Sequence, residues 1–144
     1  MSDEKLCYDS DEEIRALVEG FESCSLPPDD FDHRAHLAVA AWYLCSMTDR
    51  QATSRMRSNL LSYIAHHEVD PKKYNETITQ FWVKRLRAAL NETDASRTSA
   101  ERVNEAIERA GSSQLVFEYY SRERVFSEEA RSGWVEPDIK PLER

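Results

Sequence analysis

The chain has 144 residues, of which 40% are hydrophobic and 32% are charged, and this balance is typical of one soluble globular domain with a single core. Its three glycines and five prolines are too few for a β-sandwich with many tight turns, whereas a helical protein needs few of either. The formal net charge of −8 argues against nucleic acid and anionic membrane surfaces as partners, because both would repel the chain.

The three cysteines, Cys7, Cys24 and Cys45, are widely spaced and form no C-x-x-C motif. This pattern favours reduced thiols over a disulfide framework or a zinc site. The N-terminal segment is acidic and has no apolar signal-peptide core, and no apolar run approaches the roughly 20 residues of a membrane span. The sequence therefore predicts a cytoplasmic protein.

The first predicted helix follows a charged segment, residues 1–9, that we expect to be a flexible N-terminus. Ser10 and Glu13 form a capping box before apolar residues at helical spacing, which predicts an amphipathic helix over residues 11–24. Two consecutive prolines then prevent the helix from continuing.

The next predicted helix, over about residues 33–47, is apolar almost all round and has Asp32 as its expected N-cap. Helical spacing places His33 and His36 on the same side as Leu37. A helix without a polar face is normally enclosed by other helices. We therefore expect a buried central helix with polar chemistry at its first turn.

Three further helices are predicted from their start signals. A T-x-x-Q capping box opens a helix over residues 49–67. The pair Asp70-Pro71 is typical of an N-cap followed by the first helical position, and it predicts a helix over residues 71–90. A third capping box opens a short helix that ends at Gly111.

The C-terminal part is less regular, with short helical patterns at residues 113–120 and 127–131. The segment beyond them suggests an extended tail anchored by its apolar residues, Trp134, Val135, Ile139 and Leu142. The predicted fold is therefore an all-α single domain, residues 10–144, with about five helices and the C-terminal tail packed across the bundle.

The first candidate site is the pair His33 and His36. Residues three apart on a helix point the same way, so both imidazoles could bind one metal ion, with Glu76 from another helix as third ligand. Such a set suits Zn, Fe, Mn or Ni, which makes a divalent transition metal a candidate cofactor. The alternative is structural: one histidine bonds Asp32 or a backbone carbonyl, and the other packs on an aromatic ring.

The second candidate site is the sequence YNETIT, which places five hydrogen-bonding side chains in six positions at a helix start. Buried polar groups must be paired, either with a ligand or with each other. In a ligand pocket the orienting residues would be Tyr74, Asn75, Thr77 and Arg85. In a structural network Glu76 would pair with an arginine, and the threonines would bond to backbone carbonyls.

Three stretches, FDHRAHLAVAAWYL, YNETIT and the tail with YS and PDIKPL, together resemble a family of small, mostly bacterial, all-helical proteins of uncharacterised function. The family pattern is F-x-H-x-x-H-L-x-x-A-x-x-Y-L, then Y-H-E-T-I-T, then P-D-x-x-P-L. The resemblance implies a helical fold that gathers His33, His36, Tyr74, Glu76 and Thr77, and it supplies no activity. Where the family often has histidine this chain has Asn75, a poor metal ligand, which weakens the metal hypothesis.

The leading functional hypothesis is a small-molecule-binding helical protein with a polar pocket between the helices 33–47 and 71–90. Its core would be His33, His36 and Glu76, which in an enzyme would transfer protons or hold a catalytic metal. The competing hypothesis is a non-catalytic protein-interaction module in which these residues are structural. The sequence leaves open whether the protein is an enzyme, what its substrate is and whether it forms oligomers.

Overall fold

The computed structural model describes residues 7–142, and every regular element within that range is a helix. In chain order the elements are α1 Asp11–Glu22, η1 Pro28–Asp30, α2 His33–Leu44, α3 Asp49–His66, η2 Pro71–Lys73, α4 Glu76–Asn91, α5 Ser99–Ala110, η3 Ser113–Leu115, α6 Val116–Tyr119, α7 Arg122–Val125 and α8 Glu128–Ser132, where η denotes a 3₁₀ turn. Of the helices in this part of the chain, none is both long enough and apolar enough to cross a membrane.

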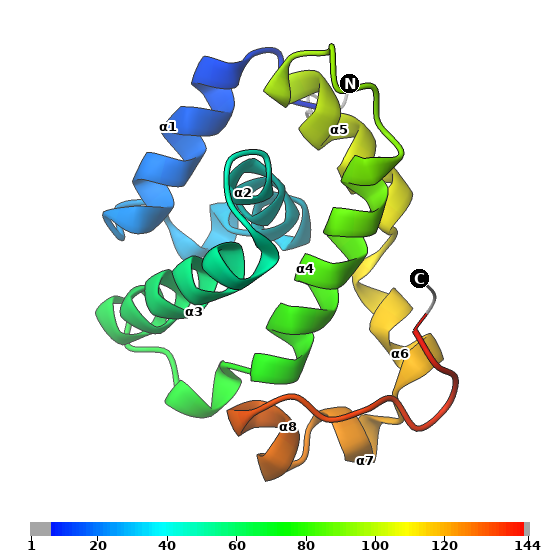
Figure 1. Ribbon diagram of the computed structural model, residues 1–144. Helices are drawn as coiled ribbons and strands as arrows, with labels where there is room; N and C mark the ends of the chain where they lie inside the picture. The colour runs from blue at the N-terminus through cyan, green and yellow to red at the C-terminus, as the bar shows by residue number, and fades with distance from the viewer. Residues whose placement is uncertain (1–6, 143–144) are drawn as a thin grey trace, which may run out of the picture.

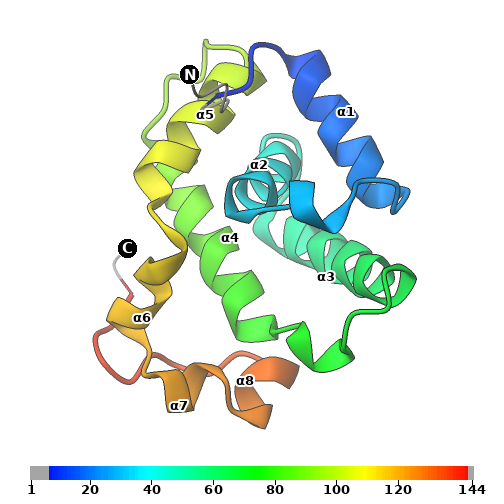
Figure 2. The same cartoon turned by 180° about the vertical axis from the view of Figure 1, so that it is seen from behind.

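Helix α2 lies in the middle of the molecule and packs against α1, α3, α4 and α5 (Figures 1 and 2). The Asp32 carboxylate caps it by accepting a hydrogen bond from the backbone N–H of Ala35 at 2.9 Å. Its buried side chains lie on nearly every side, and half of them are alanines, which let the neighbouring helices approach closely. The prediction of a buried central helix is confirmed, although α2 ends at Leu44 and is shorter than expected.

A second, smaller apolar cluster joins the C-terminal part of the chain to α4. Its buried members are Phe81, Val116, Tyr119, Tyr120 and Val125. Trp134, Val135 and Leu142 from the final segment pack against this cluster, whereas the Ile139 side chain is 56% exposed. The short helices α6 and α7 therefore attach to α4 through this cluster, and α8 contacts α4 directly.

The start of α4 differs from the prediction that this helix begins at residue 71. Asp70 caps only the short turn η2, and the chain is extended at Tyr74 before the helix begins at Glu76. The true N-cap is Asn75, whose side-chain oxygen accepts a hydrogen bond from the Ile78 N–H at 3.0 Å. Within the YNETIT sequence, the backbone therefore changes from extended at Tyr74 and Asn75 to helical at Glu76.

The beginning of the described chain is held against α5. Tyr8 donates its N–H to Asn104 Oδ1 and accepts a hydrogen bond from Asn104 Nδ2, both at 2.8 Å. The rest of the predicted flexible N-terminus, residues 1–6, lies outside the described residues.

Candidate functional site

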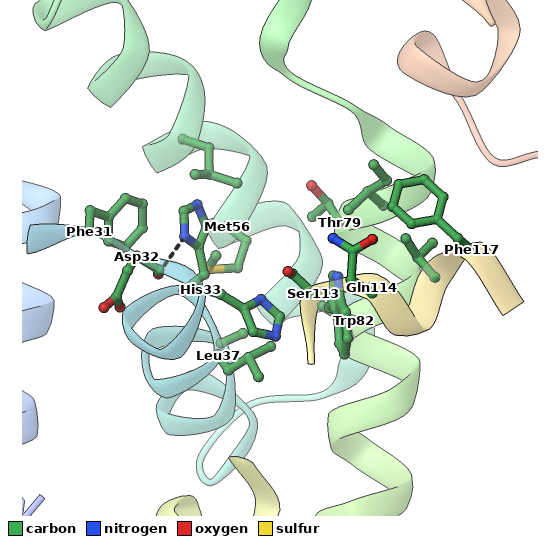
Figure 3. A pocket seen from close by; sticks show the side chains of 16 residues that line it. Phe31, Asp32, His33, Leu37, Met56, Thr79, Trp82, Ser113, Gln114 and Phe117 are labelled. Atoms are coloured by element: carbon green, nitrogen blue, oxygen red, sulfur yellow. Dashed lines mark hydrogen bonds between the residues drawn. The ribbon is translucent and has the colours of Figure 1, made fainter. Parts of the chain in front are cut away.

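A cavity of about 450 Å³ lies between the first turns of α2 and α4. Helix α3 forms one of its walls, and η3 with α6 forms another (Figure 3). Most of the lining is apolar and includes Leu37, Met56, Leu60, Trp82 and Phe117. The size and the apolar lining are typical of small-molecule sites.

His36 lines the cavity and is held in one orientation by two contacts. Its Nδ1 lies 2.9 Å from the backbone oxygen of Asp32, and its ring stacks on Phe31 with centroids 3.8 Å apart. Burial lowers the pKa of His36 below its usual value.

The bond to Asp32 fixes the tautomer of His36. A carbonyl oxygen only accepts hydrogen bonds, so Nδ1 must carry the hydrogen. In the neutral ring Nε2 is then left with its lone pair, and no donor within residues 7–142 is bonded to it. This nitrogen can accept a hydrogen bond or a proton from a bound molecule.

His33 also lines the cavity, and its Nε2 lies 3.2 Å from the backbone oxygen of Gly111. Its ring meets the edge of Trp82 with centroids 4.9 Å apart, and Figure 3 shows it directed toward Trp82 and Ser113. Gly111 follows α5 with a φ of 97°, a conformation that glycine adopts without strain. His33 thus links α2 to the turn that leads into η3.

Glu76 lies outside the cavity lining and is saturated by other side chains. Its carboxylate accepts hydrogen bonds from Arg57 at 2.7 and 2.6 Å, from the Tyr74 hydroxyl at 2.6 Å and from Gln80 at 2.6 Å. Burial opposes ionisation of Glu76, but these bonds outweigh it and lower its pKa. The pKa of Tyr74 rises to about 12, through burial and its bond to the carboxylate.

Asn75 and Thr77 connect α4 to the C-terminal segment. Asn75 Nδ2 donates to the backbone oxygen of Val125 at 2.7 Å, in addition to its capping role. Thr77 Oγ1 donates to the Gly133 oxygen at 2.7 Å and accepts from the Val135 N–H at 3.2 Å. Both side chains are buried and fully engaged by backbone groups.

Arg85 is directed to another part of the molecule. Its Nε donates to the backbone oxygen of Ala110 at 3.2 Å. It lines a separate cavity of about 580 Å³ together with Lys84 and Trp134.

The predicted site residues therefore fall into separate groups. His33 and His36 share the 450 Å³ cavity, whereas the remaining candidates lie outside its lining: Tyr74, Asn75, Glu76, Thr77 and Arg85. In the part of the chain that the structure describes, no group of three or more His, Cys, Asp or Glu side chains could hold a metal ion. The proposed ligand set of His33, His36 and Glu76 is thus not assembled in this structure.

Several cavity residues were not predicted from the sequence, among them Met56, Ser113, Gln114 and Phe117. Met56 follows the apolar pattern of α3 and looks like an ordinary core residue. Ser113 and Gln114 belong to the polar stretch after Gly111, and the helix-ending glycine was the only signal that the chain turns there.

Comparison of the chain with protein-family models, with curated protein sequences and with solved structures gave no match. The resemblance to an all-helical family stays a prediction.

Proposed function

We propose that this protein binds a small, mostly apolar molecule in the cavity between α2, α3, α4 and η3–α6. The observation that carries the proposal is that two histidines line one apolar cavity of about 450 Å³. The polar groups are few and lie at the first turns of helices, where a ligand can reach them. The proposal includes a cytoplasmic setting, in which Cys7, Cys24 and Cys45 would remain free thiols.

Glu76, Asn75 and Thr77 have a supporting role in this proposal. Their hydrogen-bonding groups are used by Arg57, Val125 and Gly133, so they hold α4 in place and leave little for a ligand to contact. Since α4 supplies Trp82 and Thr79 to the cavity wall, this network positions the site indirectly.

Calorimetric titration with 2-naphthol, a neutral aromatic probe, tests the proposal. We expect saturable binding at one site. Ala40→Leu should abolish it, because Ala40 is buried on the cavity wall and a leucine would occupy the space. Gln114→Trp should also abolish it, because Gln114 is exposed on the opposite wall and the change leaves the core intact.

Ala65→Leu is the matched control, since Ala65 is exposed on α3 and lies outside the cavity lining. This variant should bind 2-naphthol as the unmodified protein does. Absence of binding, or equal binding by all three variants, would overturn the proposal.

A further inference from the structure

The hydrogen-bonding groups of the cavity differ in how far they are already used. Nδ1 of His36 is bonded to the Asp32 backbone oxygen, which leaves the Nε2 lone pair for a ligand. The Thr79 hydroxyl is already engaged by the protein, because it donates to the Asn75 oxygen at 3.0 Å and also interacts with the Tyr74 hydroxyl. Among these two side chains, His36 therefore presents the acceptor whose geometry is fixed.

The charges around the cavity disfavour an anion. Among the described residues that line it, none is lysine or arginine, and Asp32 places a carboxylate at its edge. The donors available on the wall are neutral, such as the Gln114 amide and the Trp82 indole N–H. An anionic ligand would lose its hydration without gaining a cationic partner, which is costly.

We infer that the ligand of this cavity is a neutral aromatic or alicyclic molecule that donates a hydrogen bond from a hydroxyl or N–H group to His36 Nε2. The inference rests on the proposed function and adds the chemical class of the ligand. The apolar body packs between Trp82, Met56 and Phe117, and the donor lies at the α2 end of the cavity.

A series of three probes with one ring system tests the ligand class: 2-naphthol donates a hydrogen bond, 2-methoxynaphthalene cannot, and 2-naphthoate is an anion. Calorimetry should give the tightest dissociation constant for 2-naphthol. The methoxy compound should bind about tenfold more weakly, the scale of one net hydrogen bond. The carboxylate should be weaker still.

His36→Phe should make 2-naphthol and 2-methoxynaphthalene bind equally, since phenylalanine keeps the ring stacked on Phe31 but has no acceptor. The Asp32 oxygen keeps a partner in this variant, because it also accepts the backbone N–H of residue 36 at 3.0 Å. His66→Phe is the control: His66 is exposed at the far end of α3, so the preference for 2-naphthol should persist.

The possible outcomes separate the two proposals. Equal or tighter binding of 2-methoxynaphthalene or 2-naphthoate to the unmodified protein would overturn the ligand class and leave the binding function intact. Absence of binding by all three probes would overturn the binding function and the ligand class together. If His36→Phe fails to fold, the ranking of the three probes on the unmodified protein still decides the ligand class.

Discussion

Ionisation of the His36 imidazole should change the free energy of unfolding. Its folded-state pKa is lowered by burial, so the unfolded chain takes up a proton at a higher pH than the folded one. Neutral His36 stabilises the folded state fully at pH values above the pKa of histidine in the unfolded chain, about 6.5. This stabilisation is lost as the pH falls through the lower pKa of His36 in the folded state. The free energy of unfolding should therefore fall between pH 7.5 and pH 5.5.

Urea unfolding at these two pH values measures the effect. In His36→Phe the fall should be smaller than in the unmodified protein, whereas His66→Phe should not reduce it in this way. An equal fall in the unmodified protein and His36→Phe would contradict the assignment of a half-buried imidazole with a lowered pKa.

The polar residues around Glu76 are compatible with a ligand pocket and with a structural network, and the sequence alone does not distinguish these two explanations. Its side chain is 7% exposed, and Arg57 binds it with two hydrogen bonds, although helical periodicity places Arg57 on the outward side of α3. The long arginine side chain reaches back from that position to α4. Which arginine pairs with Glu76 depends on how α3 and α4 are placed relative to each other. The periodicity along a single helix does not predict this placement.

Glu76→Gln should lower the free energy of unfolding by about 2 kcal/mol, because it removes the charge that supports several hydrogen bonds while Arg57 stays partly solvated. The folded variant should still bind 2-naphthol, since Glu76 supports α4 from outside the cavity lining and does not contact the ligand. Urea unfolding and calorimetry provide the two readouts, with the exposed Glu108→Gln as control. Loss of binding with unchanged stability would instead give Glu76 a direct role in the site.

At the level of the helices, local capping signals predicted some starts and misplaced one. The capping boxes at Thr48 and Thr98 are both present in the structure and begin α3 and α5 as expected. Asp70-Pro71 is an equally strong local signal, yet it opens only a short turn. The start of α4 is set by Asn75, whose amide bonds Val125 fifty positions further along the chain, a contact that no local pattern reveals.

Substitutions at these two caps should therefore differ in cost. Asn75→Ala should lower the free energy of unfolding by about 2 kcal/mol, because it removes a helix cap and a buried bond to the Val125 oxygen. Asp70→Ala should cost about 0.5 kcal/mol or less, as is usual for an exposed position. Urea unfolding of both variants tests this order, and a larger cost at Asp70 would place the functional start of the helix there.

For the whole molecule, the sequence predicted an all-helical fold around α2 and the inward direction of His33 and His36. The apolar run on α2 has no polar face, so burial of that helix followed from composition alone. The cavity itself was not predictable, because its walls come from α2, α3, α4 and the turn after Gly111, which meet only in the folded chain. What looked like one polar site is an apolar cavity and a separate structural network.

The cavity beside α2 also allows a prediction about the free energy of unfolding. Ala40→Leu adds apolar surface to the cavity wall and should raise the free energy of unfolding by about 1 kcal/mol. In a close-packed region the same change would lower it by about 1–3 kcal/mol through overpacking. Thermal or urea unfolding distinguishes these cases, with Ala65→Leu reporting the effect of the same substitution on an exposed helix face.

The central claim is that a small molecule binds in the cavity beside His36, and mapping the amide and side-chain resonances of the labelled protein during titration with 2-naphthol tests it most directly. Saturable shift changes are expected at residues that line the cavity, such as His36, Met56, Trp82 and Phe117, and no changes are expected at exposed positions outside it, such as Glu108 on α5. Changes confined to other surfaces, or none at saturating probe, would contradict the central claim.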